Sequence, residues 1–159
     1  MTLAIGDKAP DFTLPATGGE TITLSALKGA PVVVYFYPKD DTPGCTTEAC
    51  DFRDNMNILK SHGVTVIGIS KDSVKKHEKF KEKFSLNFPL ASDEEGKAVE
   101  AYGVWVEKSM YGKKYMGIDR ATYLIDANGK LAQIWRPVKV PGHAAEVLAA
   151  AEKLTKKAA

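Results

Sequence analysis

The chain has 159 residues, 44% of them apolar, which predicts one globular domain (residues 1–159) whose core needs no disulfide staple. Its 22 basic and 20 acidic residues are mixed along the chain and give a net charge of +2, which excludes the charge pattern of nucleic-acid or anionic-membrane binding. No segment approaches the roughly 20 apolar residues of a membrane span, and no secretory signal pattern opens the sequence. We therefore expect a cytoplasmic protein. In a reducing compartment, two cysteines are more often catalytic or redox-sensing than joined in a structural disulfide.

Short alternating and apolar runs predict three strands near the N-terminus. Residues 11–15 and 20–24 alternate around a Gly-Gly pair, which is the pattern of a β-hairpin. A turn or single helical turn is expected at residues 25–29. Residues 31–37 (Pro-Val-Val-Val-Tyr-Phe-Tyr) form a β-branched and aromatic run, which is typical of a strand buried on both faces.

A helix is predicted to begin at Pro43 and to end before Gly63. Thr42 suits the capping position, and proline suits the first helical position because its missing N–H would be unpaired there anyway. Cys45 then lies in the first turn of this helix. Residues 64–69 form a second apolar run and predict the next buried strand.

The later segments complete the predicted fold. In chain order we expect a helix from residue 73, an extended piece at 88–91, a short helix at 94–102, an irregular aromatic loop or hairpin at 104–117, a hairpin of 121–126 with 130–136, and a helix at 143–157. This order implies parallel strands with right-handed crossovers, followed by antiparallel strands. The fold class is therefore α/β, a mixed central sheet flanked by helices. Catalytic groups are expected at the carboxyl ends of its parallel strands, where residues 38–45 lie.

Cys45 is the candidate nucleophile of the chain. Free backbone N–H groups and the positive end of a helix dipole favour a thiolate over a thiol, and the thiolate is the nucleophilic form. The alternative is that Cys45 is a small core residue beside apolar sequence. The helix start and a second cysteine, Cys50, favour the chemical role.

The spacing of Cys45 and Cys50 is unusual for a redox pair. Five residues along an ideal helix separate the two Cα atoms by roughly 8.6 Å, and a disulfide needs them within about 7 Å. The spacing also fits neither a C-x-x-C redox motif nor a zinc site. If the two cysteines pair, the first helical turns must unwind, so the pair would switch between a folded dithiol and a locally unfolded disulfide.

Several segments together resemble one protein family. Pro38-x-x-x-Thr42-x-x-Cys45 is the active-site motif of peroxiredoxins, and Pro-Gly-Cys-Thr-Thr-Glu-Ala-Cys followed by Asp-Phe-Arg-Asp resembles their bacterioferritin comigratory protein or Q-type subgroup. The likeness spans nearly the whole chain, including residues 5–12 and 120–126. It implies a thioredoxin-like fold with an N-terminal hairpin and thiol-dependent reduction of hydroperoxides.

The resemblance also assigns roles to individual residues. Cys45 resembles the peroxidatic cysteine, which attacks the terminal peroxide oxygen and becomes a sulfenic acid. Cys50 resembles the resolving cysteine of members that keep both thiols in one helix. Thr42 resembles the hydroxyl that orients the peroxide, and Pro38 the residue that shields the intermediate. Arg120 resembles the cation that supports the thiolate and the leaving oxygen.

The residues themselves leave the choice of arginine open. Only three of the 22 basic residues are arginines, and Arg53 lies about 12 Å along the helix from Cys45, too far to touch its sulfur. Residue chemistry alone does not separate Arg120 from Arg136, whereas the resemblance favours Arg120. Glu48, one turn after Cys45, could orient this arginine, but a glutamate on a helix is more often solvated, and we expect that here.

The resemblance implies two kinds of partner, a hydroperoxide substrate and an external dithiol reductant, either thioredoxin or glutaredoxin. NADPH would act only through the reductase of that partner. We expect no cofactor or metal ion, because the chain contains neither a dinucleotide fingerprint nor a metal-ligand constellation. The subgroup suggests a monomer.

Three other functions are kept as alternatives. A cysteine–histidine hydrolase would pair Cys45 with His143 or His77, although the three histidines, which include His62, are scattered along the chain. A thioredoxin-type exchange protein is disfavoured by the five-residue cysteine spacing. A redox sensor or holdase would show no turnover with thioredoxin.

Overall fold

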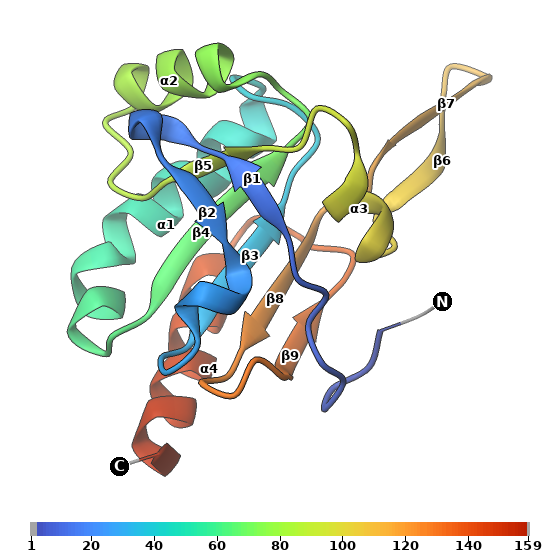
Figure 1. Ribbon diagram of the computed structural model, residues 1–159. Helices are drawn as coiled ribbons and strands as arrows, with labels where there is room; N and C mark the ends of the chain where they lie inside the picture. The colour runs from blue at the N-terminus through green and yellow to red at the C-terminus, as the bar shows by residue number, and fades with distance from the viewer. Residues whose placement is uncertain (1–2, 159) are drawn as a thin grey trace.

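A mixed five-stranded sheet lies at the centre of the structure, a computed structural model that describes residues 3–158 (Figure 1). Strand β3 (Val32–Phe36) runs parallel to β4 (Thr65–Ser70), which runs parallel to β5 (Leu90–Ser92). On its other side β3 pairs antiparallel with β8 (Ala121–Ile125), and β8 pairs with β9 (Leu131–Trp135). The predicted combination of parallel strands with a late antiparallel hairpin is confirmed.

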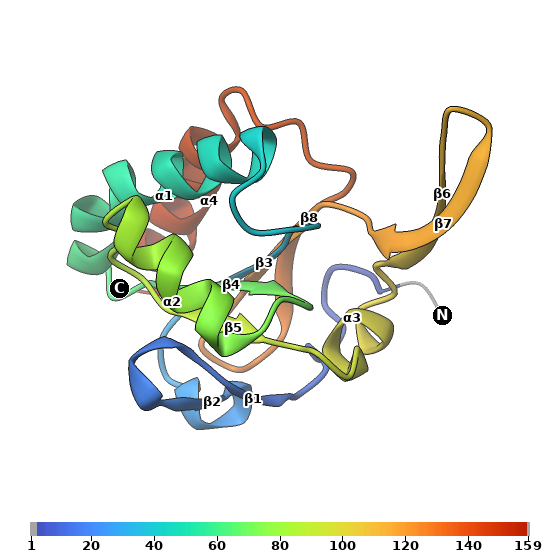
Figure 2. The same cartoon turned by 90° about the horizontal axis from the view of Figure 1, so that it is seen from above.

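Helices and a hairpin cover the two faces of this sheet (Figure 2). Helices α1 and α4 lie on one face, with α2 beside edge strand β5, and the N-terminal hairpin and α3 lie on the other. The remaining elements are α1 (Pro43–Ser61), α2 (Val74–Lys83), α3 (Lys97–Ala101), α4 (His143–Ala158), β1 (Thr13–Pro15), β2 (Thr21–Thr23), and the short 3₁₀ helices η1 (Thr17–Gly19) and η2 (Leu24–Leu27).

Strand β3 is buried on both faces, as its apolar sequence predicts. Because side chains alternate along a strand, Val34 and Phe36 pack into the core beneath the N-terminal hairpin, and Val33 and Tyr35 pack into the core beneath α1 and α4. All of these side chains are almost fully buried. Burying so much apolar surface on both sides makes β3 a firm base for the loop that follows it.

Both predicted hairpins are confirmed, since β1 pairs with β2 and β8 with β9 in antiparallel register. The segment 104–117 forms a third hairpin, of β6 (Trp105–Met110) and β7 (Lys113–Ile118), which projects away from the sheet (Figure 1). Helix α3 begins at Lys97, later than predicted. The reason is that Gly96 takes a left-handed φ of 79° and Asp93 accepts a hydrogen bond from the Val99 N–H.

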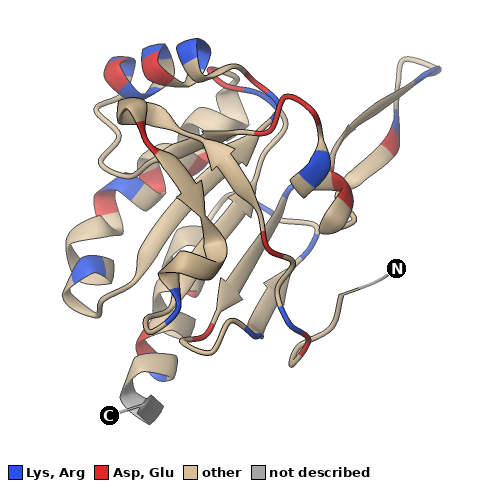
Figure 3. Cartoon of the chain, in the orientation of Figure 1, with Lys and Arg blue, Asp and Glu red and all other residues tan. Residues whose placement is uncertain are grey.

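The charged run on α2 lies on the surface, as expected of a solvated helix face. Lysine and glutamate alternate along the outer side of this helix (Figure 3). None of the helices within residues 3–158 combines the length and apolar character that crossing a bilayer requires.

We expect Gly68→Ala to lower the free energy of unfolding by about 1–3 kcal/mol, because it overpacks the core around β3. A Cβ atom at this position of β4 would lie 2.8 Å from Leu90 Cδ2 and 2.9 Å from Tyr35 Cζ. Urea unfolding measures the change. Gly117→Ala is the matched control, because its nearest neighbours are the flexible side chains of Lys108 and Tyr115 at 3.3 Å. Equal losses in both variants would contradict the packing argument.

Candidate active site

The loop after β3 delivers Cys45 to the start of α1. Helix α1 begins at Pro43 with Thr42 at the N-cap, as predicted, and Cys45 in its first turn is 2% exposed. The Thr42 hydroxyl does not cap the helix, however. It donates a hydrogen bond to the Lys39 carbonyl at 2.9 Å, and the Thr42 carbonyl accepts the first helical bond from Thr46. The helix start therefore leaves backbone N–H groups near the thiol.

Arg120 reaches Cys45 because of the register between β3 and β8. Ala121 pairs with Phe36 at the carboxyl end of β3, so Arg120, one residue earlier, lies beside the loop that leads into α1. Its Nη2 donates to Cys45 Sγ at 3.3 Å, and its Nη1 donates to Glu48 Oε1 at 2.6 Å. One guanidinium thus bridges the thiol and a carboxylate one helical turn apart.

Gly44 makes room for this guanidinium. A Cβ atom on Gly44 would lie 3.2 Å from Arg120 Nη2, closer than most side-chain contacts allow. A side chain at residue 44 would therefore push the Arg120 guanidinium by a few tenths of an ångström.

Glu48 is a buried member of the site, with a residue exposure of 1%, so its interpretation as a solvated helix residue is wrong. No group within residues 3–158 hydrogen-bonds to its Oε2. Burial raises the pKa of Glu48 to about 7, although the neighbouring Arg120 favours the carboxylate. Burial also opposes the charge on Arg120, but Glu48 and Cys45 outweigh this effect and raise the pKa of the guanidinium.

Cys50 lies on the same helix as Cys45, and both are free thiols. Cys45 is buried and Cys50 is partly exposed. Because α1 is continuous from Pro43 to Ser61, the ideal-helix separation of roughly 8.6 Å applies to the two Cα atoms. The described state is therefore the folded dithiol form of the predicted switch.

The chain matches the AhpC/TSA family over residues 5–134. It belongs to this family. The peroxiredoxin Bcp of Bacillus subtilis is 52% identical over 99% of this chain and all of its own length. The bacterioferritin comigratory protein of Xanthomonas campestris is 44% identical to this chain, with a TM-score of 0.86 over 91% of this chain and 92% of its own. It was solved as a trapped intermediate/ligand complex in a study of its alkyl peroxide reduction. A cysteine-to-serine mutant of PrxQ from Xylella fastidiosa is 39% identical, with a TM-score of 0.90 over 100% of this chain and 99% of its own.

These relatives confirm the thioredoxin-like peroxiredoxin fold and the Bcp or Q-type resemblance. The chain is a thiol-dependent peroxidase of this group. The structure brings together Cys45 and Arg120, the two residues that the resemblance places at the reacting sulfur. Thr42 lies three residues before Cys45, and Pro38 is exposed just after β3.

The histidines of this peroxiredoxin bond to groups other than the thiol. Within residues 3–158, no histidine nitrogen hydrogen-bonds to Cys45 Sγ. His143 Nε2 bonds to Thr122 Oγ1 at 2.7 Å, and burial, with Arg120 nearby, lowers the His143 pKa to about 4. The pairing that a cysteine–histidine hydrolase needs is therefore not formed.

Sequence reasoning missed two features around the site. Lys108 on β6 lies near enough for its charge to interact with Arg120 and Cys45. The pKa of Lys108 is lowered, chiefly because the side chain is partly buried and also because Arg120 is nearby. Asp119 and Cys45 oppose this shift but do not reverse it. Asp40, inside the motif, is buried against His77 of α2. The sequence did contain a signal for the burial of His77, because helical spacing places it on the same side as Val74, Phe80 and Phe84.

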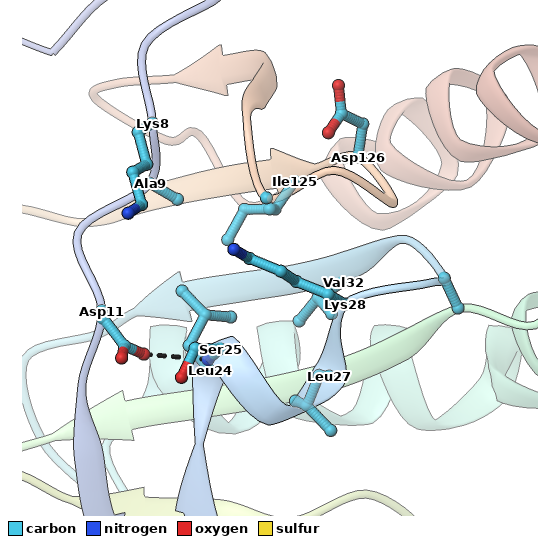
Figure 4. Close-up of a pocket in the computed structure, with 12 residues that line it drawn as sticks. Lys8, Ala9, Asp11, Leu24, Ser25, Leu27, Lys28, Val32, Ile125 and Asp126 are labelled. Atoms are coloured by element: carbon cyan, nitrogen blue, oxygen red, sulfur yellow. Dashed lines mark hydrogen bonds between the residues drawn. The ribbon is translucent and has the colours of Figure 1, made fainter.

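A hollow in the surface lies away from this site (Figure 4). It is bordered by Val32 and Ile125, which pair at the amino end of β3, and by Lys28, whose side chain extends across it. Asp11 accepts a hydrogen bond from the Ser25 N–H at its edge. This hollow is at the opposite end of β3 from Cys45 and contains none of the predicted site residues.

We expect the unfolding free energy to fall as pH rises from about 4.5 to about 7, by about 3 kcal/mol more than in Glu48→Gln. The pKa of Glu48 is raised from 4.5 to about 7, so in this range the folded state holds a proton that the unfolded state releases. Urea unfolding at several pH values measures the difference.

The Glu48→Gln variant is the necessary reference for this measurement. His143 has a lowered pKa and acts in the opposite direction over part of the range, but it does so in both proteins. Parallel pH profiles for the two proteins would contradict the assignment of this effect to Glu48.

Proposed function

We propose that the peroxidase reaction takes place at Cys45 and that hydrogen peroxide and organic hydroperoxides are its substrates. The Cys45 thiolate attacks the terminal peroxide oxygen, the O–O bond breaks, and the leaving oxygen takes up one proton to become water or an alcohol. The sulfur becomes a sulfenic acid. The hydrogen bond of 3.3 Å from Arg120 Nη2 to Cys45 Sγ, at a helix start, carries this proposal.

The neighbouring groups fit the charge changes of this step. Arg120 stabilises negative charge first on Cys45 and then on the leaving oxygen. The Thr42 hydroxyl uses its hydrogen for the Lys39 carbonyl, which leaves oxygen lone pairs available to accept a hydrogen bond from the O–H of a hydroperoxide. Pro38 is proposed to shield the sulfur once the substrate is bound.

Cys50 is the proposed resolving cysteine. Its sulfur attacks the sulfenic sulfur of Cys45, a disulfide forms and water leaves. The first turns of α1 must unwind for this step because the intact helix keeps the two cysteines apart.

The disulfide is proposed to be reduced by thioredoxin, or by glutaredoxin in its place, through thiol–disulfide exchange. A reducing, cytoplasmic compartment fits two free thiols that must be returned to the dithiol state after each turnover. We also propose that the protein acts as a monomer, because a second subunit packed over the start of α1 would oppose its unwinding.

We expect Arg120→Lys to slow the oxidation of Cys45 by about 10- to 100-fold, because an ammonium group cannot bond to Cys45 and Glu48 in the same forked geometry. Stopped-flow measurement of thiol loss with hydrogen peroxide checks this, with urea-unfolded protein as the unactivated reference. Arg136→Lys is the matched control, because Arg136 is exposed and bonds to Asp119. Equal rates in the two variants would refute the role of Arg120.

We expect Cys50→Ser to stop after one turnover with a sulfenic acid on Cys45. In the wild type, one equivalent of peroxide should give an intramolecular disulfide, visible by mass spectrometry as the loss of two hydrogens. The variant should instead be trapped by a sulfenic-acid reagent and lose turnover with thioredoxin. A stable sulfenic acid or an intermolecular dimer in the wild type would exclude Cys50 as the resolving residue.

A further inference from the structure

A buried hydrogen-bond network fastens the loop that carries the active-site motif. The carboxylate of Asp40 accepts a hydrogen bond from the Tyr37 hydroxyl at 2.5 Å, and its other oxygen lies 2.6 Å from His77 Nδ1. The side chains of Asp40 and His77 have no exposed surface. The loop between β3 and α1 is thus joined to α2 in the interior of the protein.

The contacts of His77 show how this pair tolerates burial. Its Nε2 lies 3.0 Å from the Ala91 carbonyl, which only accepts, so Nε2 carries a hydrogen. The short distance between Nδ1 and Asp40 requires a second hydrogen between them. The pair as a unit is therefore uncharged, which avoids the large cost of an unpaired buried charge. His77 also connects the loop to strand β5.

A second contact holds the backbone of the same residue. The Asp40 N–H donates to Asp72 Oδ2 at 2.8 Å. Asp72 also accepts hydrogen bonds from Ser70 Oγ at 2.6 Å and Lys76 Nζ at 2.9 Å. Asp40 is therefore fixed through both its side chain and its backbone to the segment that links β4 with α2.

The residue that follows explains why such an anchor is needed. Asp41 has a φ of +59°, in the left-handed region that costs free energy for a residue with a Cβ atom. Thr42 comes next and begins α1. The buried contacts of Asp40 hold this turn in place, and the turn sets where Thr42 and Cys45 lie.

We infer that Asp40 and His77 are positioning residues that keep the motif loop in its peroxide-reactive arrangement and oppose the unwinding of α1. This inference rests on the proposed resolution by Cys50. The segment that unwinds is bounded upstream by Asp40 and downstream by Phe52, which is fully buried and stacks on Tyr35 with ring centroids 4.8 Å apart. Releasing the upstream anchor shifts the population toward the unwound state.

The test is His77→Leu, which removes both ring hydrogen bonds with little change of volume. We expect thiol oxidation by peroxide to slow about tenfold and the following disulfide formation to speed up about tenfold, because the two steps use opposite states of α1. Stopped-flow fluorescence with stoichiometric peroxide resolves the two phases. The fraction of Cys45 over-oxidised to the sulfinic acid at high peroxide should fall.

A second variant and a control keep the test decisive. His77→Leu leaves the Asp40 carboxylate buried without its partner, so Asp40→Asn/His77→Leu removes the anchor without a buried charge and should show the same opposite changes. Lys83→Ala is the matched control. It removes an ion pair with Asp41 in the same loop, but that pair is largely exposed, so both rates should stay within about twofold.

The outcomes separate this inference from the function it rests on. A general loss of structure would slow both phases, so slower or unchanged disulfide formation in both anchor variants overturns the positioning role. If the wild type shows no disulfide phase, the resolving role of Cys50 fails and this inference fails with it. Slower oxidation together with faster disulfide formation supports the inference.

Discussion

The bridge from Arg120 to Cys45 and Glu48 is the interaction on which the site depends. It exists because β8 pairs antiparallel with β3, which places Arg120 beside the start of α1. The guanidinium is partly buried, and the neighbouring Glu48 and Cys45 offset the cost of burying its positive charge. The positive charge in turn offsets the cost of burying negative charge on these neighbours. Since the pKa of Glu48 is about 7, its charge changes near neutral pH. Above that pH, the Arg120 guanidinium interacts with an ionised carboxylate as well as with the sulfur. Below it, Glu48 is neutral, so the positive charge of Arg120 acts mainly on the sulfur.

The two proposed half-reactions make opposite demands on α1. Attack on the peroxide uses the folded helix, in which Cys45 lies in the first turn and accepts a hydrogen bond from Arg120. Disulfide formation needs the same turns to open, because the folded helix holds Cys50 about one and a half turns away. A very stable first turn would trap the sulfenic acid, and a very weak one would leave the thiol unactivated.

Much of this architecture is predictable from sequence, because its signals are local. The buried strand β3, the hairpin of β8 with β9 and the start of α1 all follow from periodicity and turn residues. The burial of Glu48 and the contact between Asp40 and His77 are not predictable in this way, since they join residues far apart in the chain. Residue chemistry alone likewise left open whether Arg120 or Arg136 reaches Cys45. The answer depends on the register between strands, which local sequence signals do not give.

The sequence of the first turn of α1 agrees with a helix that opens locally. Gly44 and Thr46 have low helix propensity, and the Thr47 hydroxyl donates back to the Pro43 carbonyl at 3.0 Å, a contact that weakens helical geometry. The large apolar side chains that secure the helix, Phe52, Met56 and Leu59, all follow Cys50, whereas Cys45 and Ala49 before it add only small side chains to the core. The weak segment therefore coincides with the part that must unwind. Its stability has to come from outside the helix, through the guanidinium of Arg120 on one side and the anchored loop on the other.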